Sequence, residues 1–278
     1  MNNLDAKIRQ AEAKWMGPIS DYIHSLYSNV HLPSHDMSHH QRVWTYCKEL
    51  LGEIHTESTM LQFTEEQVLV ACMFHDTGLV VDASERHGHQ SNVFCQQFLT
   101  NNPQLCLSGI DEVLYTIHHH DDKSLKPQSS FTNVDGITLL DVVSTADDLD
   151  AFGLVGVIRY LEIYALRGMS FDEIPKRIIP NLKNRFENFR FKFSAFPNLV
   201  EKHRERFLLT SDFFQSILNS DVDNPLTVSE HVFIAQHLID ALVNNKLDVK
   251  STIAVGLMLG HSAAQVDFYM GLKDELGL

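Results

Sequence analysis

Apolar residues recur at helical spacing along almost the whole chain, and this period constrains the fold more than any other feature of the sequence. Ile8, Ala11, Trp15 and Ile19, for example, mark one face of an amphipathic helix. No stretch shows the sustained alternation of apolar and polar residues that is typical of a half-buried strand. The pattern predicts an all-α fold, with further helices near residues 39–55, 65–75, 89–101, 109–120, 136–151 and 154–167.

Helix-start signals extend this prediction to the C-terminal part of the chain. In a capping box, a Ser or Thr is followed three residues later by an acidic or amide side chain, and the two satisfy free backbone N–H groups at a helix N-terminus. Such boxes occur at Thr64–Gln67, Ser170–Glu173, Thr227–Glu230 and Ser262–Gln265. We therefore expect helices from one end of the chain to the other.

The size and composition are those of a globular protein outside the membrane. The 278 residues are enough to bury a sizeable core, and 44% of them are hydrophobic while 21% are charged. No apolar run approaches the roughly 18 residues that a membrane-spanning helix requires, and residues 1–14 lack the apolar core of a signal peptide. The four cysteines show no Cys-x-x-Cys spacing, so we expect reduced packing residues in a soluble, cytoplasmic protein.

The negative charge of the chain narrows the range of its partners. The formal net charge of −14 argues against a general nucleic-acid surface, because neutralising phosphates requires clustered Lys and Arg. A small phosphorylated substrate is compatible with this charge, since a bound metal ion would reverse the local field.

An apolar run ends at His75 and Asp76, two adjacent residues whose side chains can both bind a metal ion. Two further candidates, His39 upstream and Asp147 downstream, each border an apolar helical stretch. Two imidazoles and two carboxylates form a mixed nitrogen and oxygen ligand set, which suits a divalent transition metal such as Mn, Fe, Co, Ni or Zn. Neighbouring side chains on a regular helix point about 100° apart. His75 and Asp76 can therefore share an ion only beyond the helix end, where the chain turns at Gly78.

Three segments around these residues carry longer patterns. They read His39-His40-Gln41-Arg42-Val43, Phe74-His75-Asp76-Thr77-Gly78 and Thr145-Ala146-Asp147-Asp148-Leu149-Asp150-Ala151-Phe152-Gly153. These segments resemble the H-x-x-R-V, H-D-x-G and D-A-D-x-L-D-A-x-G segments of the HD superfamily of metal-dependent phosphohydrolases. The resemblance covers about residues 35–170 and departs from the family at Thr145, where many members carry an additional Asp. It implies an HD-domain-like helical bundle whose metal ligands are His39, His75, Asp76 and Asp147.

Turn-forming residues cluster at 221–225, and this cluster predicts a division of the chain. An HD-type metal-dependent hydrolase domain would occupy residues 1–220, and residues 221–278 would form a helical C-terminal extension that packs on it or serves in oligomerisation. A homodimer is therefore one expected assembly.

In two-metal members of the superfamily, histidines from two later regions hold a second ion. Here the best candidates for a second metal or for phosphate contacts are His89 and His120, with His118 and His119 as competitors. The positions of Val113 and Ile117 favour His120, because the spacing i, i+4, i+7 places its imidazole on the buried face of the helix.

The reaction that the resemblance implies is hydrolysis of a small phosphomonoester or a nucleotide, with one or two metal ions as cofactor. Asp76 would both bind metal and orient or deprotonate the attacking water. Arg42 and the loop residues Arg86 and Lys123 are candidates to contact the substrate phosphate. Surface charge is the alternative for Arg86 and Lys123, and His35 either lines the mouth of the site or caps a turn.

Two other functions stay open. A minority of the superfamily uses a mixed-valent di-iron centre as an oxygenase, which needs about six ligands and therefore a complete second site. A noncatalytic sensor would retain the pocket and bind a metabolite, although a pure binding module has no need for all four ligands of the first group.

Overall fold

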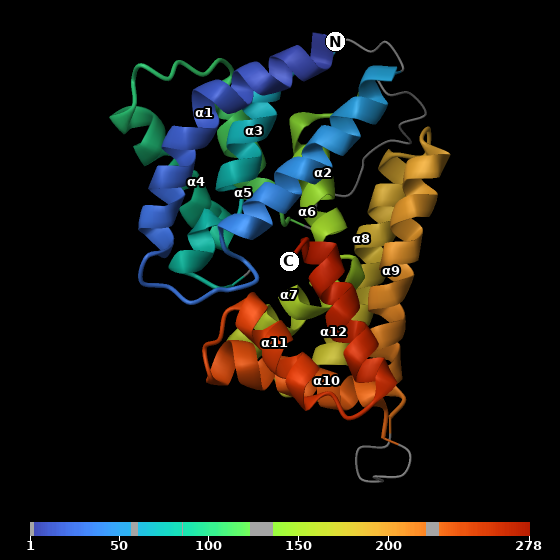
Figure 1. Ribbon diagram of the computed structural model, residues 1–278. Coiled ribbons are helices and arrows are strands. Elements are labelled where there is room, and N and C mark those ends of the chain that lie inside the picture. The colour runs from blue at the N-terminus through green and yellow to red at the C-terminus, as the bar shows by residue number, and fades with distance from the viewer. Residues whose placement is uncertain (1–2, 57–60, 85, 123–135, 221–227) are drawn as a thin grey trace. The chain divides into compact units, whose positions relative to one another are not determined.

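The computed structural model describes residues 3–56, 61–84, 86–122, 136–220 and 228–278, and in these ranges the chain is all-α (Figure 1). No strand occurs in this described part of the chain. The predicted helical class is therefore confirmed. The chain divides into two compact units.

The first unit comprises Met1–Val30, His35–Leu149 and Asn188–Pro197. Its main elements are the helices α1 (Asn3–Tyr27), α2 (Met37–Thr56), α3 (Glu65–Phe74), α4 (His87–Asn101) and α5 (Ile110–His119), the 3-10 turn η1 (Thr77–Val80), and all but the last residue of α6 (Leu139–Asp150). Helix α3 packs against α1, α2 and α5, while α4 packs against α5 and η1. Helix α3 is therefore the centre of this unit (Figure 1).

Helix α3 is short and almost entirely buried. Its N-terminus carries the predicted capping box, in which the Thr64 hydroxyl accepts a hydrogen bond from the Gln67 backbone N–H and the Gln67 side chain accepts one from the Thr64 N–H. From Val68 to Phe74 every residue is apolar and fully buried. A helix that is apolar on all sides must lie in the interior, so the residues that follow Phe74 are carried into the core.

The second unit comprises His31–Ser34, Asp150–Glu187 and Asn198–Leu278. Its helices are α7 (Gly153–Leu166), most of α8 (Ile174–Lys192) and α9 (Pro197–Leu218), α10 (Glu230–Ile239), α11 (Val249–Leu259) and α12 (Ala263–Leu276), and a π-helical turn, η3 (Asp240–Asn244), extends α10. Helix α7 packs against α10, η3 and α12. The Glu275 carboxylate fixes the start of α7, because it accepts a hydrogen bond from the Leu154 N–H at 2.7 Å and pairs with Arg206 at 2.7 Å.

Helix starts in the second unit follow the sequence signals in part. The Ser262 hydroxyl accepts a hydrogen bond from the Gln265 N–H at the start of α12, as predicted. Helix α10 instead begins after Ser229, whose hydroxyl accepts from the His231 N–H, and Thr227 of the predicted box lies outside the described residues. The local cap therefore differs from the predicted one, while the predicted helix is present.

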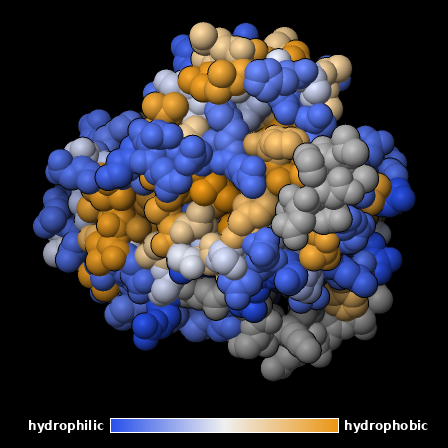
Figure 2. Space-filling view, turned by 90° about the horizontal axis from the view of Figure 1, so that it is seen from below, coloured by the Kyte–Doolittle hydropathy of each residue, from blue (hydrophilic) through white to orange (hydrophobic). Residues whose placement is uncertain are grey.

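The face of the molecule in Figure 2 is mostly hydrophilic, with smaller groups of apolar side chains between the polar ones. Exposed apolar residues such as Val81 and Met258 are usual on folded proteins. Among the described helices, none combines the length and the apolar character needed to cross a membrane. The domain boundary near residue 220 and the homodimer stay predictions.

Candidate metal centre

The end of α3 places His75 and Asp76 in the interior of the first unit. The α-helix stops at Phe74, and the chain continues from Asp76 into the 3-10 turn η1. Glycine is required at Gly78 in this turn, because a Cβ atom there would collide with the His87 carbonyl oxygen. The change in backbone direction lets two neighbouring side chains converge on one point, as we expect if they share an ion beyond the helix end.

A first ligand group consists of His39, His75, Asp76 and Asp147. All four are buried, and each offers one ligand atom within 4.8 Å of the others. The Nε2 atoms of His39 and His75 are 3.1 Å apart, and each lies 3.7 Å from Oδ1 of Asp147. Oδ2 of Asp76 is 3.1 Å from Nε2 of His39 and 3.5 Å from Nε2 of His75. The structure thus brings together the four residues that the sequence predicts as ligands.

A second ligand group, formed by Asp76, His87 and His120, uses the other oxygen of the same carboxylate. Oδ1 of Asp76 is 2.9 Å from Nε2 of His87 and 3.0 Å from Nε2 of His120. These two Nε2 atoms are 3.2 Å apart. Helix α4 supplies His87, and His120 directly follows α5. Asp76 therefore belongs to both groups, which together contain four imidazoles and two carboxylates.

Backbone hydrogen bonds fix the orientation of three of these imidazoles. The Nδ1 atoms of His75, His87 and His120 each lie 2.6 to 2.8 Å from a backbone carbonyl oxygen. A carbonyl oxygen can only accept a hydrogen bond, so Nδ1 carries the hydrogen and Nε2 of the neutral ring presents a lone pair. Metal-binding histidines in proteins are held in the same way.

In neutral rings these lone pairs point at one another, and a proton or a metal ion between them would relieve their repulsion. Around Oδ1 of Asp76, three potential ligand atoms meet at 2.9 to 3.2 Å. Ligand atoms about 2.1 Å from a divalent ion are themselves about 3.0–3.4 Å apart in octahedral or tetrahedral coordination. The separations in the second group are close to this range, and those in the first group extend from 3.1 to 3.7 Å. Each group could therefore hold a metal ion.

Charges within the cluster keep the shared carboxylate ionised. Burial alone would raise the pKa of Asp76, but the charge of His75 and hydrogen bonds from three further imidazoles hold it well below its usual value. His40 lies beside the cluster and is fully buried, and this burial together with the neighbouring imidazoles lowers its pKa well below the usual value. The ligand set therefore has a charged carboxylate at its centre, and the neutral imidazole of His40 lies beside the set, with its ring centroid 5.3 Å from that of His75.

We expect metal binding at the second ligand group to tighten as the pH rises. Burial alone would lower the pKa of His87, but its hydrogen bond to Asp76 and the charge of that carboxylate raise it to about 9. A metal ion must therefore displace a proton from His87 at neutral pH, and the affinity should rise about tenfold per pH unit up to about pH 9. Mn²⁺ titrations at several pH values measure this slope. An unchanged slope in His87→Gln would contradict the assignment of the proton to His87.

The same raised pKa has the opposite effect on the stability of the metal-free protein. Protonated His87 stabilises the fold fully below about pH 6.5, the usual pKa of a histidine. This contribution is lost as the pH rises through the folded-state pKa of about 9. Raising the pH should thus weaken the metal-free fold while it strengthens metal binding.

One residue predicted for the second ligand group, His89, lies outside the group, and His87 belongs to it instead. The sequence predicts His89 there, but α4 begins at His87, which is buried, and His89 is exposed. His120 lies in the group, as the spacing of the buried residues predicts. His118 and His119 do not: the ring centroid of His118 is 5.6 Å from that of His89 and 4.5 Å from that of His119.

The four residues predicted to contact the substrate take different positions. His35 is buried, with its ring centroid 5.6 Å from that of His39. Arg42 is half-buried on α2, and its guanidinium donates a hydrogen bond to a serine hydroxyl one turn earlier. Arg86 is exposed, and Lys123 lies outside the described residues. His35 and Arg42 thus flank the end of α2 that carries His39.

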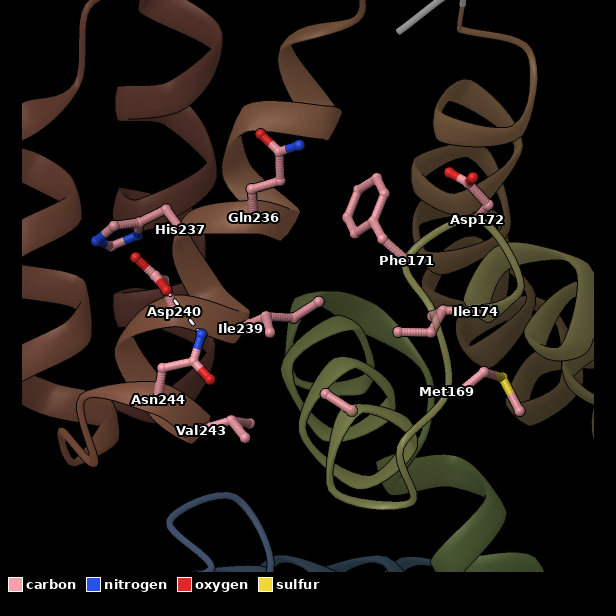
Figure 3. A pocket seen from close by; sticks show the side chains of 11 residues that line it. Met169, Phe171, Asp172, Ile174, Gln236, His237, Ile239, Asp240, Val243 and Asn244 are labelled. Carbon is pink, nitrogen blue, oxygen red and sulfur yellow. Dashed lines mark hydrogen bonds between the residues drawn. The ribbon is translucent and has the colours of Figure 1, made fainter.

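A separate cavity of about 780 Å³ lies in the second unit. It is lined by the end of α7, the segment that leads into α8, and α10 with the π-helical turn η3 (Figure 3). Phe171 and Asp172 lie on one side of it and Gln236 and Asp240 on the other. None of its lining residues belongs to either ligand group, so this cavity is not part of the metal centre.

Comparison of the chain with protein-family models, with curated proteins and with solved structures found no match. The case for a metal centre therefore depends on the six side chains themselves. They are buried, they come from the ends and faces of helices in one compact unit, and they point their ligand atoms at common centres.

Proposed function

We propose that this chain is a metal-dependent phosphohydrolase of the HD type, which cleaves a small phosphomonoester or a nucleotide. The observation that carries the proposal is the convergence of two ligand groups on Asp76. One carboxylate that serves two sets of imidazoles is suited to hold two ions side by side, the arrangement that is used for in-line displacement at phosphorus. When bound, such ions activate water and neutralise charge on a phosphoryl oxygen.

Asp76 has the central part in this proposal. Both of its oxygens lie close to imidazole nitrogens, Oδ2 beside His39 and Oδ1 beside His87 and His120. We therefore expect Asp76 mainly to hold the two ligand groups at a fixed distance from each other. The additional role of orienting or deprotonating the attacking water stays a prediction.

Arg42 is the most suitable residue to bind the substrate phosphate. It lies on the same helix as His39, one turn further on, and it is half-buried. A partly buried guanidinium forms strong charge-assisted bonds with phosphoryl oxygens. His35, which is buried with its ring centroid 5.6 Å from that of His39, is a further candidate to contact the substrate.

A second candidate function is a di-iron oxygenase of the same superfamily. The observation in its favour is the complete set of six candidate ligands, four imidazoles and two carboxylates. Imidazole and carboxylate ligands both suit iron. In this case the protein would consume O₂ only with iron bound, and it would not release phosphate with other ions.

One series of assays distinguishes the phosphohydrolase from the oxygenase. Metal-free protein is loaded in parallel with Mn²⁺, Co²⁺, Ni²⁺ and Fe²⁺, and phosphate release from an aryl phosphate and from a panel of phosphorylated metabolites is measured with and without O₂. We expect anaerobic phosphate release with Mn²⁺ or Co²⁺, and we expect Asp76→Asn to abolish it. Asp111→Asn, an exposed site on α5 in the same unit, is the matched control.

Protein with verified metal content that releases no phosphate from any member of the panel would contradict hydrolysis. Iron-dependent O₂ consumption in the same samples would then favour the oxygenase. If neither activity appears and a metabolite still binds, the chain is a sensor.

A further inference from the structure

The cavity in the second unit has the size and the interior of a small-molecule site. Its volume of about 780 Å³ lies within the roughly 300–1,000 Å³ that is typical of ligand pockets. Ile174 and Ile239 point toward each other across it, and the ring of Phe171 lies beside them (Figure 3). Its other apolar lining residues are Ala165, Met169 and Val243. The interior of the cavity therefore suits an apolar group.

The charge at the mouth of the cavity is negative. Its lining includes two exposed carboxylates, Asp172 and Asp240, and none of the described residues that line it is a Lys or an Arg. Within the described part of the chain, neither carboxylate is paired with a cationic side chain, and Asp240 accepts a hydrogen bond from the Asn244 amide at 2.7 Å. Burial lowers the pKa of His237, so this lining imidazole is neutral at neutral pH. The protein therefore leaves the negative charge of this mouth available to a ligand.

Helix α10 and its π-helical extension supply one wall of the cavity. The spacing i, i+3, i+4, i+7, i+8, which marks one helical face, is occupied by Gln236, Ile239, Asp240, Val243 and Asn244. The last three belong to η3, in which the Asn245 N–H donates a hydrogen bond to the Asp240 carbonyl oxygen at 2.8 Å. Turns of the π type are rare, and they occur frequently at functional sites. This turn is therefore a second feature, besides the cavity itself, that indicates a binding site.

The charge of the cavity selects among possible ligands. A phosphate group would meet two like charges at Asp172 and Asp240, which is unfavourable without a cationic side chain to offset them. An organic cation would instead meet opposite charges, and the face of Phe171 can attract an ammonium group. The cavity is therefore unsuited to the phosphorylated substrate of the metal centre and suited to an amine.

We propose that this cavity binds a small organic cation with an apolar body, such as an arylalkylamine. The apolar body packs between Ile174 and Ile239, and the ammonium group lies at the mouth, where Asp172 and Asp240 attract it. No residue of either metal-ligand group lines this cavity, so the binding of the cation does not require a bound metal ion.

Nuclear magnetic resonance of the isotope-labelled, full-length protein tests the proposal with phenethylamine as the probe. Phenethyl alcohol and phenylpropionate, which carry the same ring with a neutral and a negative group, are the comparison probes. We expect phenethylamine to shift the backbone signals of Gln236, Val243 and Asn244 and to bind about three- to tenfold more tightly than the alcohol. Phenylpropionate should bind more weakly than both. Added salt should reduce the preference for the amine, because exposed charges are screened.

Substitution of the two carboxylates separates this site from unspecific attraction to an acidic protein. Asp172→Asn and Asp240→Asn should each weaken phenethylamine binding by about two- to fivefold, the range expected for an exposed ion pair. Asp212→Asn, at an exposed position on α9 in the same unit, should leave the affinity unchanged.

Three results would overturn the proposal. One is a titration in which phenethylamine shifts no signal of the lining residues. Another is phenylpropionate that binds as tightly as the amine. The third is equal affinity in the wild type and in the double variant Asp172→Asn, Asp240→Asn, or an equal loss in Asp212→Asn. None of these results depends on metal content, so the proposed metal centre would stand or fall separately.

Discussion

Replacing Asp76 by asparagine is expected to empty both ligand groups at once. The amide has nearly the same shape as the carboxylate, but it is neutral, and its nitrogen presents hydrogens where Oδ1 or Oδ2 now presents a lone pair. The six-residue set would lose the charge that holds His87 protonated in the metal-free state and that would hold metal in the loaded state. We expect metal content to fall close to zero and phosphate release to fall by about 10²–10³-fold or more.

The fold should survive this substitution. Asp76 lies after the end of α3, outside the apolar run from Val68 to Phe74, so the helical circular dichroism spectrum should be unchanged. Metal content after dialysis, measured by elemental analysis, reports the first effect directly. Asp111→Asn should retain the full metal content of the wild-type protein, because Asp111 is exposed and far along α5 from His120. An Asp76→Asn protein that holds as much metal as the wild type would contradict the shared role of the carboxylate.

Replacing Gly88 by alanine is expected to damage the second ligand group through the backbone. The added Cβ would lie 2.5 Å from the His118 carbonyl oxygen and 3.2 Å from that of Ile117, and both are backbone atoms that cannot turn away. Helices α4 and α5 must therefore separate, which moves His87 away from His120. We expect a loss of stability of about 1–3 kcal/mol and a lower melting temperature.

Gly52→Ala is the matched control for this change. Gly52 lies within α2, and a Cβ atom there would meet nothing within 4 Å. Alanine should therefore stabilise the helix by about 0.5–1 kcal/mol. We therefore expect the melting temperature to fall in Gly88→Ala and to rise in Gly52→Ala, both with and without Mn²⁺. Stabilisation by both substitutions would show that the approach of α4 to α5 is not as close as the structure has it.

The helical fold is largely predictable because its signals are local. The period of apolar residues predicts α2 and α3, and the capping box at Thr64 predicts where α3 begins. Burial of α3 on every side is also visible in its unbroken apolar run. The division into two compact units is not visible in the sequence, since it depends on which faces of distant helices meet.

The candidate site is predictable where the residues are tied to strong helices. His75 and Asp76 follow from the end of α3, and His120 follows from the buried face of α5. His87 is missed because it and His89 are two residues apart at a helix start, and helix boundaries are the least certain part of a sequence-based prediction. The close approach of Gly88 to the His118 backbone is a contact between residues distant in the sequence, so no local signal favours His87.

Anomalous X-ray diffraction from crystals of the Mn²⁺-loaded protein would test the metal centre most directly. We predict two peaks on either side of the Asp76 carboxylate, each about 2.0–2.3 Å from its ligand atoms. One should lie among His39, His75 and Asp147, and the other between His87 and His120. A well-resolved map without an anomalous peak in contact with any of these side chains would contradict the account.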